Sequence, residues 1–202
     1  MSEEQRAIVK LTDAQGRTGA AYDTPLQWGP GVTHTVPLWS GAMCQSGVLH
    51  CYEGATVRDA LALAILRAPQ DGCFGQTARA WVCEGSGRHV TNGIKSGYET
   101  LSTVREIPLP EATTEQRVEC AIRIAWEVCD DPAWRAWAQA WLDGTDRTEE
   151  AAMAARAAAR SAARSAAAVA ARAADEGVDV AAIAGSVLLP EWTDTEGVGN
   201  SE

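Results

Sequence analysis

An alanine-rich segment from residue 151 to residue 174 constrains this chain more than any other part of its sequence. The segment holds 16 Ala and 4 Arg, and alanine has the highest intrinsic helix propensity of the amino acids. We therefore predict one long helix from Thr148 to about Glu176, roughly 40 Å in length at about 1.5 Å per residue. A helix of this composition can form with little help from tertiary packing.

The arginines of this segment fall on one side of the predicted helix. Arg156, Arg160 and Arg164 are spaced by four residues and Arg172 follows eight residues later, so they form a slanted basic stripe. The stripe is either a solvated face or a contact for an acidic partner or nucleic acid. The opposite face is almost purely alanine, and small side chains let helices approach closely. We expect that face to pack on other helices or on a copy of itself, which predicts a homo-oligomer formed through the alanine-rich helix.

Three shorter helices are predicted around this segment. The sequence Thr113-Thr-Glu-Gln116 is a capping box that begins the first of them. Asp131 followed by Pro132 is typical of a second helix start, and Gly144 ends that helix. Residues 179–189 predict a short apolar helix. Three tryptophans line one side of the second helix and are expected in the core: Trp134, Trp137 and Trp141.

The first half of the chain is expected to form strands. Short apolar runs predict strands at residues 6–11 and 48–52, and alternation of apolar and polar residues predicts strands at 78–83 and 101–107. Residues 85–97 are rich in glycine and are predicted to be turns. One helix is expected in this half: it begins with Thr56 as its N-cap and stops before Pro69.

Together these patterns predict an α+β protein. Residues 1–112 are expected to form a compact, β-rich domain. Residues 113–190 form an all-helical region that includes the long alanine-rich helix, and residues 191–202 are predicted to be a disordered acidic tail.

Charge and cysteine usage limit the compartments and partners. The formal net charge is −10, which disfavours nucleic acid and anionic membranes, and no apolar run approaches the ~20 residues that a membrane span needs. Residues 1–11 lack the apolar run of a signal peptide, so we expect a cytoplasmic protein with reduced thiols. No pair of its cysteines has C-x-x-C spacing; they are Cys44, Cys51, Cys73, Cys83, Cys120 and Cys129.

No catalytic or metal-binding motif stands out. His34, His50, Cys44 and Cys51 offer zinc ligands, but their spacing fits no zinc-binding motif. His50 and Cys51 are adjacent in a predicted strand, so their side chains point to opposite faces and make a poor base and nucleophile. We therefore predict no catalytic residue, no metal ligand and no cofactor.

A set of aromatic, amide and basic residues instead suggests binding of a small ligand. Tryptophan and tyrosine rings stack on a nucleobase, and histidine and lysine contact phosphate. Gly29 and Gly31 would let backbone N–H groups approach a phosphate. The alternative is that the aromatic residues belong to the core and that the glycines form a turn. The predicted ligand-binding residues are Gln27, Trp28, His34, His50, Tyr52 and Lys95.

The order of several motifs resembles an uncharacterised family of bacteriophage and prophage proteins, over about residues 6–175. The alanine-rich tail that follows Trp141-Leu-Asp-Gly-Thr-Asp-Arg147 is also similar. The other matching segments are Gln27-Trp-Gly-Pro-Gly-Val-Thr-His34, Cys44-Gln-Ser-Gly-Val-Leu-His-Cys-Tyr52, Leu101-Ser-Thr-Val-Arg-Glu-Ile-Pro-Leu-Pro110 and Thr113-Thr-Glu-Gln-Arg-Val118.

The resemblance implies a phage accessory protein that works in the cytoplasm of a host cell. We expect a non-catalytic binder that sequesters a nucleotide-type immune signal of the host, a counter-defence function. Two alternatives stay open. One is an ADP-ribosyltransferase-like enzyme, because residues 47–52 and the following helix loosely resemble an element of that fold; its essential glutamate would be Glu84 or Glu106. The other is a structural or protein-interaction module without a ligand.

Overall fold

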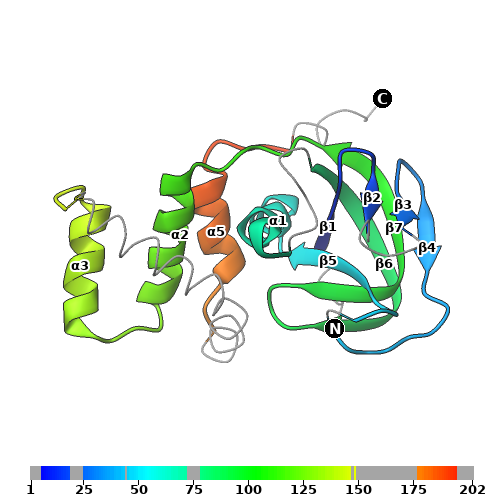
Figure 1. Cartoon of the computed structure of the whole chain (residues 1–202), viewed down its shortest axis with the longest axis horizontal. Helices are drawn as coiled ribbons and strands as arrows, with labels where there is room; N and C mark the ends of the chain where they lie inside the picture. The colour runs from blue at the N-terminus through cyan, green and yellow to red at the C-terminus, as the bar shows by residue number, and fades with distance from the viewer. Residues whose placement is uncertain are drawn as a thin grey trace.

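The computed structural model describes residues 6–18, 25–43, 45–71, 78–146, 148 and 177–194, and it shows a mixed α+β protein. The strands come from the first half of the chain and pack against helices from both halves (Figure 1). The predicted alanine-rich helix with its arginine stripe lies outside the described residues. So does the chain after Asp194.

Four strands pair into a closed antiparallel ring. β1 (Ala7–Thr12) lies between β5 (Leu49–Gly54) and β6 (Arg79–Thr91). β7 (Ser96–Ile107) pairs with both β6 and β5, and so completes the ring. A short strand, β4 (Thr33–Thr35), extends the sheet along β7. β2 (Arg17–Thr18) and β3 (Leu26–Gln27) form a separate two-stranded sheet.

The β6–β7 hairpin is much longer than predicted, and the expectation of turns over residues 85–97 was wrong. β6 continues to Thr91, and the turn is confined to residues 92–95, where the Asn92 side chain accepts hydrogen bonds from the backbone N–H groups of Ile94 and Lys95. Glycine lets other groups approach the backbone of this hairpin closely. Gly85 leaves room for the Tyr98 ring, because a Cβ at Gly85 would come within 2.7 Å of that ring. Two register shifts let the hairpin bend around the ring.

The interior of the ring is apolar at its centre and polar elsewhere. Trp28 is buried against this centre from the loop after β3. Lys10 is also buried; its Nζ donates to the carbonyl of His50 at 2.8 Å and lies 4.5 Å from the centre of the Trp28 ring. The strand residues that form the apolar centre are Ile8, Leu49, Cys51, Trp81, Cys83 and Leu101.

α1 (Val57–Asp71) covers the outer face of β1 and β5. It begins at Thr56 as predicted: the Thr56 hydroxyl accepts from Asp59 N–H, and the Asp59 carboxylate accepts from Thr56 N–H. The predicted stop before Pro69 was wrong, because the helix continues to Asp71. Proline has no N–H to donate to the carbonyl four residues earlier. That carbonyl, of Ile65, accepts a hydrogen bond from Arg117 Nη1 at 2.8 Å instead.

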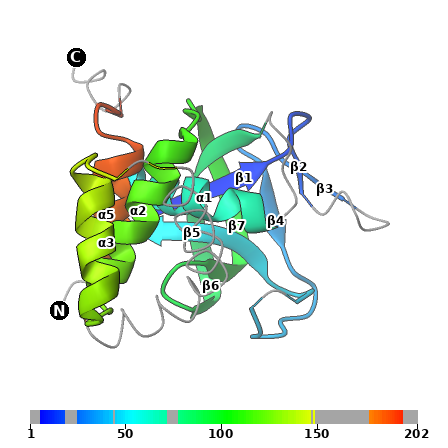
Figure 2. The same cartoon turned by 60° about the vertical axis from the view of Figure 1, so that its left-hand side comes forward.

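The helices of the second half form successive layers away from the sheet. α2 (Thr114–Trp126) begins with the predicted capping box, and α3 (Pro132–Leu142) begins with Asp131 as its N-cap. α5 (Val180–Leu188) returns between α1 and α2 (Figure 1), and Figure 2 shows α2, α3 and α5 together on one side of the sheet. Trp141 is buried between α2 and α3, whereas Trp134 and Trp137 are half-buried.

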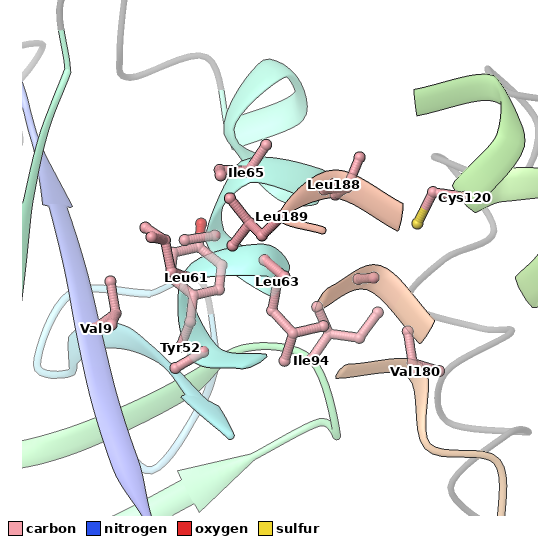
Figure 3. Packing of buried hydrophobic residues seen from close by; sticks show 14 of the residues in the cluster. Val9, Tyr52, Leu61, Leu63, Ile65, Ile94, Cys120, Val180, Leu188 and Leu189 are labelled. Atoms are coloured by element: carbon pink, nitrogen blue, oxygen red, sulfur yellow. The ribbon is translucent and has the colours of Figure 1, made fainter. Parts of the chain in front are cut away.

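One core cluster joins the two halves of the chain. Figure 3 shows Tyr52, Leu61 and Leu63 in one cluster with Val180 and Leu188 of α5. The cluster therefore crosses the domain boundary predicted at residue 112. Past residue 190, Trp192 packs against the same cluster and Asp194 pairs with Arg105 at 2.5 Å. Among the described residues, no helix combines the length and the apolar character that a membrane crossing requires.

Candidate functional site

A buried carboxylate lies at one end of the ring. Glu53 is in β5, where the side chains of residues 49, 51 and 53 alternate inwards. Its side chain is only 4% exposed. Three side chains donate hydrogen bonds to it: the hydroxyls of Ser96 and Tyr98, and Nε2 of His89 at 2.9 Å. Because a buried charge needs such partners, Glu53 organises this end of the ring.

His89 is the exposed member of this group, with 37% of its side chain accessible. Its ring lies 4.6 Å from the Tyr98 ring, centre to centre, with a tilt of 35°. The short contact to Glu53 assigns the N–H to Nε2 in the neutral ring, which leaves Nδ1 as the other ring nitrogen. Within the described part of the chain, no hydrogen bond is made by Nδ1. His89 therefore presents an aromatic face and a ring nitrogen at the surface. We call Glu53, His89, Ser96 and Tyr98 the Glu53 cluster.

The local backbone explains how these side chains meet. The register shift between Ser86 and His89 changes which β6 residues face inwards, and it brings His89 opposite Tyr98. Ser96 lies opposite Cys51 of β5, and its Oγ is 3.0 Å from the Thr91 hydroxyl. The cluster thus joins β5 to both strands of the hairpin at the point where the ring closes.

The electrostatics keep Glu53 ionised. Burial alone would raise the pKa of its carboxyl, but the hydrogen bonds from Ser96 and Tyr98 and the nearby His89 outweigh burial and lower that pKa below its usual value of 4.5. The pKa of the Tyr98 hydroxyl is raised. Burial is the larger cause, and the hydrogen bond to Glu53 raises this pKa further. Glu53 is therefore a carboxylate and Tyr98 a protonated donor at neutral pH.

A positive charge completes the surroundings. Arg6 is exposed at the start of β1, and its guanidinium acts on Tyr98 by lowering the pKa of the hydroxyl against the larger upward effects. The His89–Tyr98 ring pair thus lies at one end of the ring, and the Arg6 guanidinium is near enough to act on Tyr98. These groups suit a planar ligand that carries an anionic group.

Three of the predicted ligand-binding residues lie together, in and beside the ring. Trp28 is buried, and its indole N–H donates to the Thr18 hydroxyl at 2.8 Å. His34 packs edge-on against Trp28 at 4.5 Å and contacts the Gln27 carbonyl through Nε2 at 2.8 Å. The Gln27 amide donates to the carbonyl of Gln15 at 2.8 Å. Their polar groups are thus engaged in holding the loops around β2 and β3.

The other three predicted residues lie elsewhere. Tyr52 is 3% exposed and belongs to the core under α1, on the opposite face of β5 from the ring interior (Figure 3). His50 precedes Cys51 and follows Leu49, which both face inwards, so its half-buried side chain faces outwards. Lys95 is half-buried in the hairpin turn, next to Ser96. The six predicted residues therefore do not form one pocket.

The thiols and acids considered from the sequence occupy defined places. Burial raises the pKa of Cys51, and raises the pKa of Cys83 and of Cys120 to about 12, so these thiols stay protonated. Among the described residues, no three histidine, cysteine or acidic side chains are grouped to hold a metal ion. Of the two glutamates that the enzyme alternative requires, Glu106 pairs with Arg79 and Glu84 is exposed on β6.

The sequence did not point to the Glu53 cluster, because its members looked ordinary. Glu53 is a single acid at the end of an apolar strand, and His89 falls within the stretch predicted to be turns. Ser96 and Tyr98 are two residues apart, so a strand through residues 96–98 would have placed them on one face. No protein-family model, curated protein or solved structure matches this chain.

Proposed function

We propose that the chain binds a nucleotide-type small molecule at the Glu53 cluster without converting it. The observation that carries the proposal is the exposed His89 ring, in tilted contact with Tyr98 and held by the ionised Glu53. A rigid aromatic pair offers a stacking surface at little entropic cost. The proposal keeps the ligand class expected from the sequence and moves its site from Trp28 to His89.

The charges around the cluster favour an anionic ligand. Glu53 is surrounded by donors and nearly inaccessible, so a ligand meets His89 and Arg6 before it meets the carboxylate. The Arg6 guanidinium can donate charge-assisted hydrogen bonds to phosphate, and the His89 ring can stack on a base. The phage resemblance adds the biological setting of the proposal, in which a phage protein in the host cytoplasm sequesters a nucleotide immune signal.

The hydrogen bond between Glu53 and His89 also supports a second candidate, an enzyme. A carboxylate that orients a histidine lets the free ring nitrogen accept a proton from a substrate. His89 would then be the general base, which differs from the glutamate-centred ADP-ribosyltransferase-like reaction considered from the sequence.

A ligand search separates these candidates. We expect mass spectrometry of molecules released from the purified full-length protein to find a nucleotide in unchanged form. Titration calorimetry with a bacterial nucleotide extract should show binding that His89→Ala abolishes and His34→Ala retains. If His34→Ala abolishes binding and His89→Ala does not, the site is the one predicted from the sequence. Conversion of the nucleotide, NAD included, would establish the enzyme instead.

We further propose that the chain forms a homo-oligomer through residues 151–174. Each buried alanine methyl contributes less than about 1 kcal/mol, but the sum over several helical turns and two copies is several kcal/mol. Alanine loses almost no side-chain entropy on burial. Light scattering should give a multiple of the 21.4 kDa chain mass, and Ala159→Glu with Ala163→Glu should return the protein to a monomer.

A further inference from the structure

An open groove of about 490 Å³ lies between α2, α3 and α5, away from the Glu53 cluster. Each of the three helices contributes one apolar side chain to it: Trp126 from α2, Leu142 from α3 and Ile183 from α5. All three side chains are half-buried. The groove therefore offers three apolar side chains among polar ones, a mixed surface that a neighbouring helix could cover.

The rim of the groove is acidic. Glu127 and Asp143 line it, and neither carboxylate forms an ion pair with any side chain in the described ranges. Arg123 also lines the groove, but Glu119 neutralises it at 2.8 Å. The surrounding region is acidic as well: residues 111–146 hold 8 Asp or Glu and 3 Arg, so their net charge is 3 − 8 = −5.

The chain itself contains a segment of opposite character. Residues 151–174 carry 4 Arg and no acid among small side chains. Alanine lets a helix approach an apolar groove closely, while arginines spaced by four residues reach the acids on a rim. No other stretch of the sequence combines a positive charge of this size with an almost uniform small-residue face.

The proposed self-association points to a second copy as the source of this segment. α2, the longest wall of the groove, has 13 residues and measures about 20 Å. As one helix, residues 151–174 would measure about 36 Å, which is enough to cover that wall.

We propose that the groove between α2, α3 and α5 receives the segment 151–174 of a second copy of the chain. Trp126, Leu142 and Ile183 contact its alanines, and Glu127 and Asp143 pair with its arginines. The inference rests on the proposed self-association and adds the surface against which the segment packs.

Charge reversal on the full-length chain tests the groove. Glu127→Lys with Asp143→Lys should weaken self-association by about tenfold or more, because lysines on the rim repel the arginines. Glu84→Lys with Glu111→Lys changes the net charge equally at two exposed positions outside the groove and should leave the association constant within about twofold. Circular dichroism checks that both variants are folded. Sedimentation equilibrium measures the association constants.

Reversing the charges of the segment as well tests whether the two surfaces pair with each other. Arg156→Glu with Arg160→Glu should also weaken association, and an equal mixture of this variant with the groove variant should recover a heteromeric complex. If the groove variant associates with the same constant as wild type, the groove is not the contact surface, although the chain still self-associates. A wild-type chain that stays monomeric at micromolar concentration overturns both.

Discussion

At the scale of single residues, the Glu53 side chain links β5 to both strands of the hairpin. It accepts from Ser96, Tyr98 and His89 while almost fully buried. Glu53→Gln replaces one acceptor oxygen with an NH₂ group that faces donors. We predict a loss of about 1–3 kcal/mol in the free energy of unfolding, the usual range for an unsatisfied buried polar group. Urea denaturation measures it, and Glu84→Gln, at an exposed position of β6, serves as the control with no change.

The same residue makes a pH prediction. Because the folded pKa of Glu53 is lowered, its contribution to stability is present above its unfolded pKa of 4.5 and is lost as pH falls through its folded pKa. Between about pH 7 and about pH 3, wild type should therefore lose more unfolding free energy than Glu53→Gln. Both proteins contain the other acids, so the difference between them removes the contribution of those acids to the pH dependence. Glu99 is one of them, and Arg88 lowers its pKa to about 2. Parallel curves for the two proteins would contradict the assignment.

At the scale of elements, the β6–β7 hairpin depends on a glycine beneath an aromatic ring. A side chain at Gly85 would meet the Tyr98 ring. We predict that Gly85→Val costs about 1–3 kcal/mol, the usual effect of overpacking. Ser86→Val, one residue further at an exposed position, should be close to neutral. Thermal unfolding compares the two, and an equal effect would show that the strand tolerates β-branched residues poorly everywhere.

The tryptophans of α3 differ in burial, and their truncation should differ accordingly. Trp141 is 6% exposed, so Trp141→Ala should cost about 3–5 kcal/mol, the range for a buried tryptophan. Trp137 is half-buried, so Trp137→Ala should cost less. Guanidinium denaturation gives both values. If Trp137→Ala lowers the free energy of unfolding more than Trp141→Ala does, then Trp137 makes its main contacts with residues outside the described part of the chain.

Local signals predicted several elements well. The Thr113 capping box and the Asp131-Pro132 start each mark a helix, because the side chain that satisfies the first N–H groups is adjacent in sequence. Prediction failed where a distant residue decides the outcome. α1 continues past Pro69 with Arg117 bonded to the carbonyl of Ile65, 52 residues away. No local pattern contains such a partner.

The Glu53 cluster escaped prediction for the same reason at the scale of the whole molecule. Its donors lie 36, 43 and 45 residues from Glu53 in sequence, and only closure of the ring brings them together. The α+β class, in contrast, follows from the order of strand and helix patterns along the chain. Trp28 and Tyr52 were read as one aromatic surface, but they belong to core clusters on opposite faces of β5.

Nitrogen-15 NMR of the imidazole rings can follow each histidine of the chain, because there are only three. In the free full-length protein, we predict that the His89 ring carries an N–H on Nε2, bonded to Glu53. On addition of a bacterial nucleotide extract, the His89 signals should shift, while those of His34 and His50 stay in place. A shift at His34 or His50 with His89 unchanged, or no shift at any ring, would contradict the account.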